Sequence, residues 1–199
     1  MNIPSGNDKA LTFRPLTPET WDDFEALFRQ PGDQKGCWCV FWRVTRREFQ
    51  ENMGEGNRQL MRAIVGMGRV PGILAYRDGE AIGWCSVAPR EEFHSLNRSR
   101  TLKPIDERPV WSITCFVVAK PYRNQGMTRA LIEAAVDYAR RNGAQVVEAY
   151  PLTAVPHDSP FLEGELYMGL VSTFLSLGFR EAARRSERRV IMRLELGEA

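Results

Sequence analysis

The clearest pattern of hydrophobic and polar positions lies between residues 110 and 150. Residues 110–118 form an apolar run rich in β-branched and aromatic side chains, too short to span a membrane, and they predict a buried strand. From Gln125 onward, apolar residues recur with the period of an amphipathic helix, and Asn142-Gly143 marks its end with a left-handed cap. Residues 145–150 predict a second strand, so this part of the chain is a strand–helix–strand unit.

On either side of this unit, segments with the two-residue period of a strand alternate with segments that have the 3.6-residue period of a helix. Asp78-Gly79 between two apolar runs is a strong signal for a β-hairpin, with Ile82, Trp84 and Ser86 on one face. Thr17-Pro18 is a typical helix start. The predicted strands are 11–16, 73–76, 81–87, one that opens at Gly178-Phe179, and 190–195, and the predicted helices begin at Pro18 and cover 46–53, 57–67, 91–96 and 166–177.

Two segments without regular periodicity are expected to be loops. Residues 97–109 are polar and irregular, either the edge of a binding site or an ordinary surface loop. Residues 151–164 form a second loop, whose chemically interesting side chains are His157, Asp158, Phe161 and Glu163. The composition alone does not assign a function to either segment.

Composition and charge narrow the class of protein. With 199 residues, the chain is expected to form one domain over residues 1–199, with residues 1–10 flexible. A net charge of +2 without a basic block argues against a nucleic-acid surface, and no apolar run is long enough for a membrane span or a signal segment. The four cysteines show no disulfide framework, so a reduced, cytoplasmic protein is expected.

The junction between residues 118 and 128 has the properties of an anion site. A buried strand leads into the start of a helix, where the first backbone N–H groups have no partner within the helix and the helix dipole adds positive charge. Gly126 lacks a Cβ, so a ligand can approach the backbone, and Arg123 adds a planar cationic group suited to phosphate. The junction therefore predicts a phosphate or pyrophosphate site.

The spacing Arg123-x-x-Gly126-x-Thr128 resembles the Arg/Gln-x-x-Gly-x-Gly/Ala signature of the GNAT superfamily of acyl-CoA-dependent N-acetyltransferases. This chain has Thr128 where the signature has Gly or Ala. The larger side chain leaves a ligand less room to approach one of the backbone N–H groups. The resemblance implies an α/β (α+β) fold: a central mixed, mostly antiparallel sheet with a splayed parallel pair, flanked by helices. It also implies acetyl-CoA as acyl donor, an amine as acceptor, no metal, and a homodimer as a possible assembly.

The resemblance assigns roles to residues of this junction. Backbone groups of Phe116 and Val118 would bind the pantetheine arm of CoA like an added strand, and an N–H near Val118 would polarise the thioester. The pyrophosphate would be held by Arg123 and by the N–H groups of five consecutive residues, Asn124, Gln125, Gly126, Met127 and Thr128.

The catalytic groups are less well specified. Many members of the family place a tyrosine acid shortly before the Gly-Phe pair, but that position here is Phe174, which has no proton to donate. Tyr167, about two turns earlier in the predicted helix, is the substitute acid. Glu148 is the candidate base, acting through water, with Tyr150 and His157 as weaker candidates. Catalysis by positioning alone, with water taking the protons, stays open.

Residues 37–42 combine two cysteines with three aromatic residues. Cys37 and Cys39 suggest metal binding or redox chemistry, but no second Cys or His pair completes a metal site, so packing is the favoured interpretation. In GNAT-like proteins this region covers the acceptor site, which would make Trp38, Phe41 and Trp42 part of the pocket wall; core packing is an equal alternative for each.

The nature of the acceptor stays open, because two features point in different directions. The aromatic residues of this segment suggest an apolar or aromatic amine. An anionic acceptor is suggested instead by the basic side chains of Arg90, Arg98, Arg100 and Lys103.

Three functional hypotheses follow from the sequence. The first is an N-acetyltransferase that transfers the acetyl group of acetyl-CoA to a small amine. The second is a non-catalytic module on the same fold that binds or senses acyl-CoA, which the phenylalanine at position 174 favours. The third is a redox or metal protein built on Cys37 and Cys39.

Overall fold

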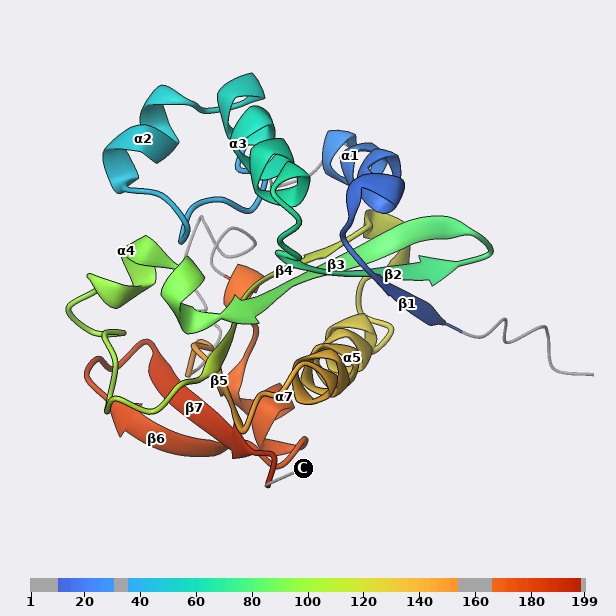
Figure 1. Ribbon diagram of the computed structural model, residues 1–199. Coiled ribbons are helices and arrows are strands. Elements are labelled where there is room, and N and C mark those ends of the chain that lie inside the picture. Colours follow the sequence, from blue (N-terminus) through green and yellow to red (C-terminus); the bar gives the residue numbers. More distant parts are fainter. Residues whose placement is uncertain (1–10, 31–35, 154–165, 198–199) are drawn as a thin grey trace, which may run out of the picture.

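A computed structural model describes residues 11–30, 36–153 and 166–197 and contains one seven-stranded sheet (Figure 1). The strand order is β1-β2-β3-β4-β5-β7-β6. The pair β4–β5 is parallel and the other neighbouring pairs are antiparallel, which confirms the predicted mixed sheet. The strands are β1 (Thr12–Pro15), β2 (Gly72–Arg77), β3 (Glu80–Pro89), β4 (Trp111–Val118), β5 (Val146–Ala149), β6 (Arg180–Arg184) and β7 (Val190–Glu195).

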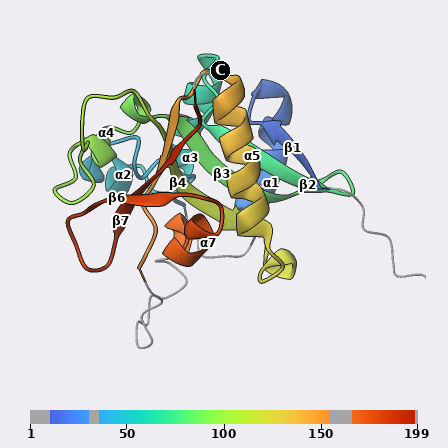
Figure 2. The same cartoon turned by 90° about the horizontal axis from the view of Figure 1, so that it is seen from below.

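Helices cover both faces of the sheet. α1 and α3 lie on one face and α5 crosses the other, as the two perpendicular views show (Figures 1 and 2). None of the helices among the described residues is long and apolar enough to cross a membrane. The helices are α1 (Trp21–Arg29), α2 (Arg46–Glu51), α3 (Glu55–Gly66), α4 (His94–Asn97), α5 (Met127–Arg141) and α7 (Val171–Leu175), with 3-10 turns at Pro18–Thr20, Arg90–Glu92, Lys120–Tyr122 and Leu166–Met168.

The helix α5 follows its sequence pattern closely. Its buried stripe includes Leu131, Ala135 and Ala139, and Gly143 closes it with a left-handed φ of 84°. It begins at Met127 rather than Gln125, because Gly126 has a φ of 77° and cannot belong to a right-handed helix. Most other predicted boundaries differ from the structure by one or two residues.

The β2–β3 hairpin does not keep the simple alternation expected from its sequence. Tyr76 pairs with Ala81 but Ala75 pairs with Gly83, so Ile82 is an extra residue in β3. As a result Ile82 joins the core on the α5 face, and Trp84 lies in the core beneath α1. The expectation that these two side chains share a face was wrong, because a bulge shifts the phase of the alternation by one residue.

A second bulge lies in β4. Ser86 pairs with Cys115 but Val87 pairs with Ile113, which makes Thr114 the extra residue. The parallel pairing of β4 with β5 runs only from Trp111 to Ile113 and stops at this bulge. Beyond it, the second half of β4 has no ladder to β5, so the sheet opens between these two strands.

The predicted helix over residues 166–177 was wrong in its first half. Residues Leu166–Met168 form a 3-10 turn, Gly169 is left-handed with a φ of 78°, and only then does α7 begin. A Cβ on Gly169 would come within 3.1 Å of the Phe174 ring, so the tight approach needs glycine. The break separates Tyr167 from α7 and leaves it beside β4.

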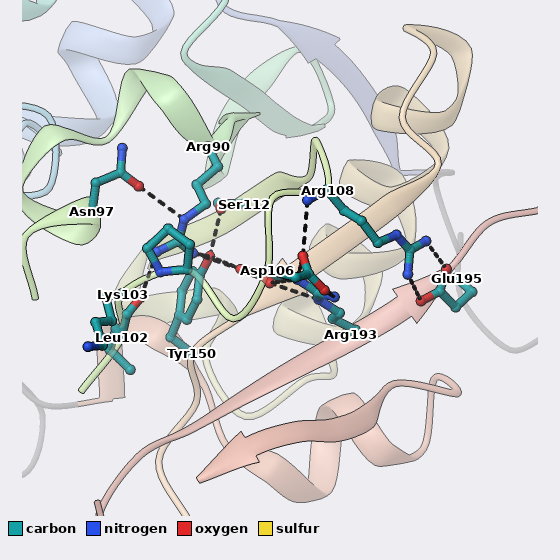
Figure 3. Close-up of polar contacts among 12 residues, drawn as sticks. Arg90, Asn97, Leu102, Lys103, Asp106, Arg108, Ser112, Tyr150, Arg193 and Glu195 are labelled. Atoms are coloured by element: carbon teal, nitrogen blue, oxygen red, sulfur yellow. Dashed lines mark hydrogen bonds and ion pairs between the residues drawn. The ribbon is translucent and has the colours of Figure 1, made fainter. Parts of the chain in front are cut away.

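A buried ionic network ties β5 to its surroundings (Figure 3). The Glu148 carboxylate, 0% exposed, accepts hydrogen bonds from Arg90 Nη1 at 2.7 Å and from Arg193 Nε at 2.8 Å. Arg193 also binds the Asp106 carboxylate at 2.6 and 2.9 Å, and Arg90 donates to the Leu102 carbonyl. The network therefore anchors the irregular segment 97–109 to the sheet.

Replacing the central anion of this network tests its contribution to stability. Glu148→Ala would leave the buried Arg90 guanidinium without its carboxylate partner and would remove one of the two carboxylates bound by Arg193, and it is expected to lower the free energy of unfolding by about 3–5 kcal/mol. Chemical denaturation monitored by circular dichroism measures the change. Glu51→Ala is the control: it removes the exposed Arg47–Glu51 pair and is expected to cost about 0.5 kcal/mol or less. Equal losses in both variants would contradict a special role for the network.

Candidate functional site

A cavity of about 890 Å³ lies where β4 separates from β5 and where α5 begins. Twelve of the residues singled out in the sequence line it: Cys37, Cys39, Phe41, Trp42, Phe116, Val118, Arg123, Asn124, Gly126, Met127, Thr128 and Tyr167. Among those that do not line it are Gln125, Trp38 and Glu148. The cavity thus brings the predicted anion site, the open strand and part of the aromatic segment together.

The start of α5 presents backbone N–H groups at one end of the cavity. Asn124 and Gly126 both have left-handed backbones, with φ values of 60° and 77°, and they turn the chain into the helix. The first N–H groups, from Gly126 to Arg129, have no acceptor within the helix. A Cβ built on Gly126 would meet nothing within 4 Å, so the backbone there is open to an incoming group.

Arg123 joins this helix start to the end of β4. Its Nε donates to the Val118 carbonyl at 3.1 Å, which holds the guanidinium at the wall of the cavity. The Gln125 side chain is turned away and donates to the Pro121 carbonyl at 2.7 Å, so only the backbone of Gln125 is placed for an anion. Together, a fixed cation and a helix N-terminus make an electropositive corner.

The second half of β4 offers an unpaired strand edge. Ala119 N donates to Ile82 O at 2.9 Å, which directs the backbone groups of Ala119 toward β3. Because backbone direction alternates along a strand, those of Phe116 and Val118 point the other way, toward the gap left by β5. The Val118 carbonyl is already used by Arg123. An extended ligand lying in the gap would therefore meet the edge of β4 as an added strand does.

A strained turn places the cysteines and aromatic residues of the segment 36–42. Trp38 and Cys39 have positive φ values of 46° and 57°, which are rare for such side chains. The turn directs Cys37 and Cys39 to the cavity wall but buries Trp38, whose ring stacks on Phe28 at 5.7 Å. Trp38 therefore packs in the core and does not line the cavity.

Phe41 and Trp42 form the aromatic wall of the cavity. Their rings meet edge to face, with centroids 4.9 Å apart. Tyr167 lies near them, since Trp42 is close enough to influence the pKa of its phenol. Burial is the main cause of a strongly raised pKa at Tyr167, so the phenol keeps its proton at neutral pH.

Among the described residues, the other catalytic candidates do not line the cavity. Glu148 is enclosed by Arg90 and Arg193, which speaks against its predicted role as a base. Tyr150 is fully buried and bonded to the same carboxylate at 2.7 Å. Phe174 is buried against Phe179 with ring centroids 5.1 Å apart. The loop candidates His157, Asp158, Phe161 and Glu163 lie outside the described residues.

The cysteines have no structural sign of metal binding. All four are free thiols, and among the described residues no group of three or more His, Cys, Asp or Glu side chains could hold a metal ion. Burial raises the pKa of Cys37 to about 12, and a hydrogen bond with Cys39 together with burial raises the pKa of Cys115 well above its ordinary value. The thiols of Cys37 and Cys115 are therefore neutral at physiological pH and act as small apolar groups.

The family follows from a comparison of sequences. The acetyltransferase (GNAT) family model matches residues 38–157, which contain the whole strand–helix–strand unit. The chain belongs to the GNAT family of acetyltransferases. No protein of curated function matches the sequence.

Solved structures share the GNAT fold. An acetyltransferase of the GNAT family from Desulfovibrio desulfuricans is 18% identical, with a TM-score of 0.53, and the match covers 94% of this chain and 100% of that one. A ribosomal-protein-alanine N-acetyltransferase from Brucella melitensis is 18% identical, with a TM-score of 0.53 and coverage of 93% and 99%. PaiA N-acetyltransferase from Thermoplasma acidophilum, solved with coenzyme A, is 12% identical, with a TM-score of 0.51 and coverage of 94% and 99%.

Sequence reasoning missed part of the cavity wall in this GNAT protein. The missed residues are Arg129 in the first turn of α5, Ser172, Thr173 and Ser176 in α7 and at its C-terminal end, and Phe28, Cys115, Val117 and Leu166. Cys37 and Cys39 were singled out, but for metal or redox chemistry rather than for a place in the wall. Arg129 lies in the first turn of α5, where the polar face of the helix borders the cavity. The remaining residues reach the cavity through tertiary packing, which no local pattern specifies.

The electropositive corner is tested by a double substitution. Arg123→Ala with Gly126→Glu removes the fixed cation and sets a carboxylate among the open N–H groups, so it is expected to abolish CoA binding and leave the fold intact. Calorimetric titration with CoA measures the binding, and circular dichroism the fold.

Arg140→Ala with Gly143→Glu is the matched control. Gly143 has the same left-handed backbone, with a φ of 84°, and the same open surroundings at the other end of α5. This control carries equal backbone strain and charge change and is expected to bind CoA as the wild type does. Normal CoA binding by the Arg123/Gly126 variant would contradict the assigned site.

Proposed function

We propose that this GNAT protein is an N-acetyltransferase that transfers the acetyl group of acetyl-CoA to the amine of a small molecule. One observation carries the proposal: the residues of the electropositive corner, the unpaired edge of β4 and Tyr167 all line the same cavity. These are the groups needed to hold a diphosphate, align an extended thioester arm and protonate a leaving thiolate. The proposal treats residues 1–199 as one domain.

The cofactor is assigned along the cavity. The pyrophosphate of acetyl-CoA would accept from the N–H groups at the start of α5 and from Arg123. The pantetheine arm would lie against Phe116 and Val118, in the gap between β4 and β5. The structural neighbour solved with coenzyme A supports this class of cofactor, and the groups at the start of α5 and along the edge of β4 fit it.

The reaction needs a nucleophile, an acid and a stabilised oxyanion. The neutral amine attacks the thioester carbonyl carbon, a backbone N–H of the open β4 edge stabilises the oxyanion, and the C–S bond then breaks. The departing thiolate takes the phenolic proton of Tyr167, and the proton lost by the amine passes to water and back to the phenolate. Glu148 is given no part in these steps, because it is sealed between two arginines.

The non-catalytic alternative rests on Phe174. This residue occupies the position at which many GNAT proteins carry a tyrosine acid, and its buried ring offers no proton. A protein of this kind would bind acetyl-CoA and CoA in the same cavity without turnover. The two functions therefore share the binding step and differ in the release of free thiol.

Binding and turnover are measured separately. Calorimetric titration of the purified protein with acetyl-CoA and with CoA is expected to give saturable binding of both. A thiol-release assay with a panel of amines is then expected to show acetylation, with the product identified by mass spectrometry. Binding without thiol release for every amine would favour the sensing module, and the absence of binding by a folded sample would refute both functions.

Tyr167→Phe tests the assigned acid. The variant removes one hydroxyl group, so kcat is expected to fall by about 100-fold or more while the affinity for CoA is unchanged. Since burial raises the pKa of Tyr167 above its ordinary value of 10.0, the wild-type kcat should not fall as the pH approaches 10.0.

Phe174→Tyr is the companion variant. It adds a hydroxyl to a side chain that does not line the cavity, so it is expected to destabilise the fold and to restore nothing in the Tyr167→Phe background. Full activity of Tyr167→Phe, or rescue of that variant by Phe174→Tyr, would show that Tyr167 is not the general acid.

A further inference from the structure

The two ends of the cavity differ in charge, and this difference bears on the identity of the acceptor. Among the described lining residues, the charged side chains are Arg123 and Arg129, both at the start of α5 where the diphosphate is assigned. The opposite end is walled by Phe28, Phe41, Trp42 and Leu166 together with the side chains of three cysteines, Cys37, Cys39 and Cys115. The acceptor end thus offers an apolar surface.

The basic side chains that suggested an anionic acceptor are placed elsewhere. Arg90 is buried and bound to Glu148, Asn97 and the Leu102 carbonyl (Figure 3), so its guanidinium is used within the fold. Arg98, Arg100 and Lys103 are not among the residues that line the cavity. The guanidinium of Arg189 lies 5.5 Å from the centre of the Tyr167 ring, but it donates to the Tyr150 carbonyl and does not line the cavity. An acceptor with a carboxylate or phosphate would therefore lose its hydration without gaining a cationic partner among the described residues that line this end.

Acceptors with several positive charges are disfavoured for the same reason. No Asp or Glu side chain is among the described residues that line the cavity. A second ammonium group, as in a polyamine, would have to be buried against aromatic rings and thiols without a counter-ion. The single reacting amine differs, because it must lose its charge before it attacks, and an apolar wall lowers the pKa of a buried ammonium group.

Other aromatic rings support the wall formed by Phe41 and Trp42, so its shape is fixed before a ligand binds. The Phe41 ring packs edge to face on Trp42 and also on Phe49 of α2, at a centroid distance of 5.1 Å. Phe28 of α1 stacks on the buried Trp38. Preorganised aromatic surfaces bind flat or bulky apolar groups with little loss of side-chain entropy.

Resting on the proposed acetyl transfer, we infer that the acceptor is a primary amine carried on an aromatic or bulky apolar group, with no second charge. The apolar group packs on Phe41 and Trp42, and the amine points toward the thioester beside Tyr167. Small polar amines, polyamines, amino acids and peptide N-termini are correspondingly poor acceptors.

A panel of acceptors tests this inference at saturating acetyl-CoA. The probes are 2-phenylethylamine, cyclohexylmethylamine, ethanolamine, spermidine, glutamate and a peptide that begins with alanine. We expect kcat/KM for the first two to exceed the others by about 10–100-fold, because a pocket built for apolar groups discriminates by burial of their surface. A preference for spermidine, glutamate or the peptide would overturn the inferred class and leave acetyl transfer standing.

A charge-reversal variant gives an independent test. Phe41→Glu places a carboxylate in the half-buried wall and is expected to raise kcat/KM for spermidine relative to 2-phenylethylamine at least tenfold. Phe41→Leu is the control, with the apolar preference retained. Unchanged CoA affinity in both variants shows that the fold and the cofactor end are intact. An unaltered ratio in Phe41→Glu would overturn the assignment of this wall.

A binding measurement separates this inference from the reaction itself. The protein loaded with CoA is titrated with 2-phenylethylamine and with spermidine by calorimetry, which requires no turnover. Binding of the aromatic amine alone supports the apolar acceptor end even if no acetylation occurs, whereas binding of spermidine alone, or of neither amine, overturns it.

Discussion

The site depends on the point at which β4 and β5 stop pairing. Their parallel ladder ends at Ile113, and the bulge residue Thr114 turns β4 away while its hydroxyl donates to the Ser86 hydroxyl at 3.1 Å. Past the bulge, backbone groups of β4 lose a strand partner, and such groups demand a hydrogen-bonding partner from outside the sheet. The opening thus creates both the space for an extended ligand and a reason for the ligand to bind there.

A sheet that opens at one point must be held firmly beside it. Ser112 of β4 pairs with Glu148 of β5, so the buried carboxylate lies on the last paired stretch. Arg90 from the end of β3 and Arg193 from β7 converge on that carboxylate. The charged network thereby joins β5 to β7 and to the turn after β3 at the base of the opening. Burying these charges costs desolvation free energy, but their mutual hydrogen bonds fix the positions of β4 and β5. In the proposed function, the alignment of the thioester depends on these fixed positions.

The sequence was sufficient for the parts of the fold with local causes. The apolar run 110–118, the period of α5 and the Asn142-Gly143 cap each follow from the residues themselves, and so does the open helix start at Gly126. The bulges at Ile82 and Thr114 were not predictable, because one extra residue leaves the composition of a strand unchanged. Trp38 shows the same limit: its left-handed backbone, set by tertiary contacts, decides that it enters the core.

The position of the proposed acid follows from backbone geometry rather than from residue spacing. Counting back from the Gly-Phe pair leads to Phe174, whose ring is fixed in the core by Phe116 and Phe179. Gly169 interrupts the helix that would have carried Tyr167 two turns away, and its close contact with the Phe174 ring makes the interruption and the buried phenylalanine parts of one packing solution. The close approach of Gly169 to the buried Phe174 ring thus accompanies the break in the helix, and the break leaves Tyr167 at the cavity wall.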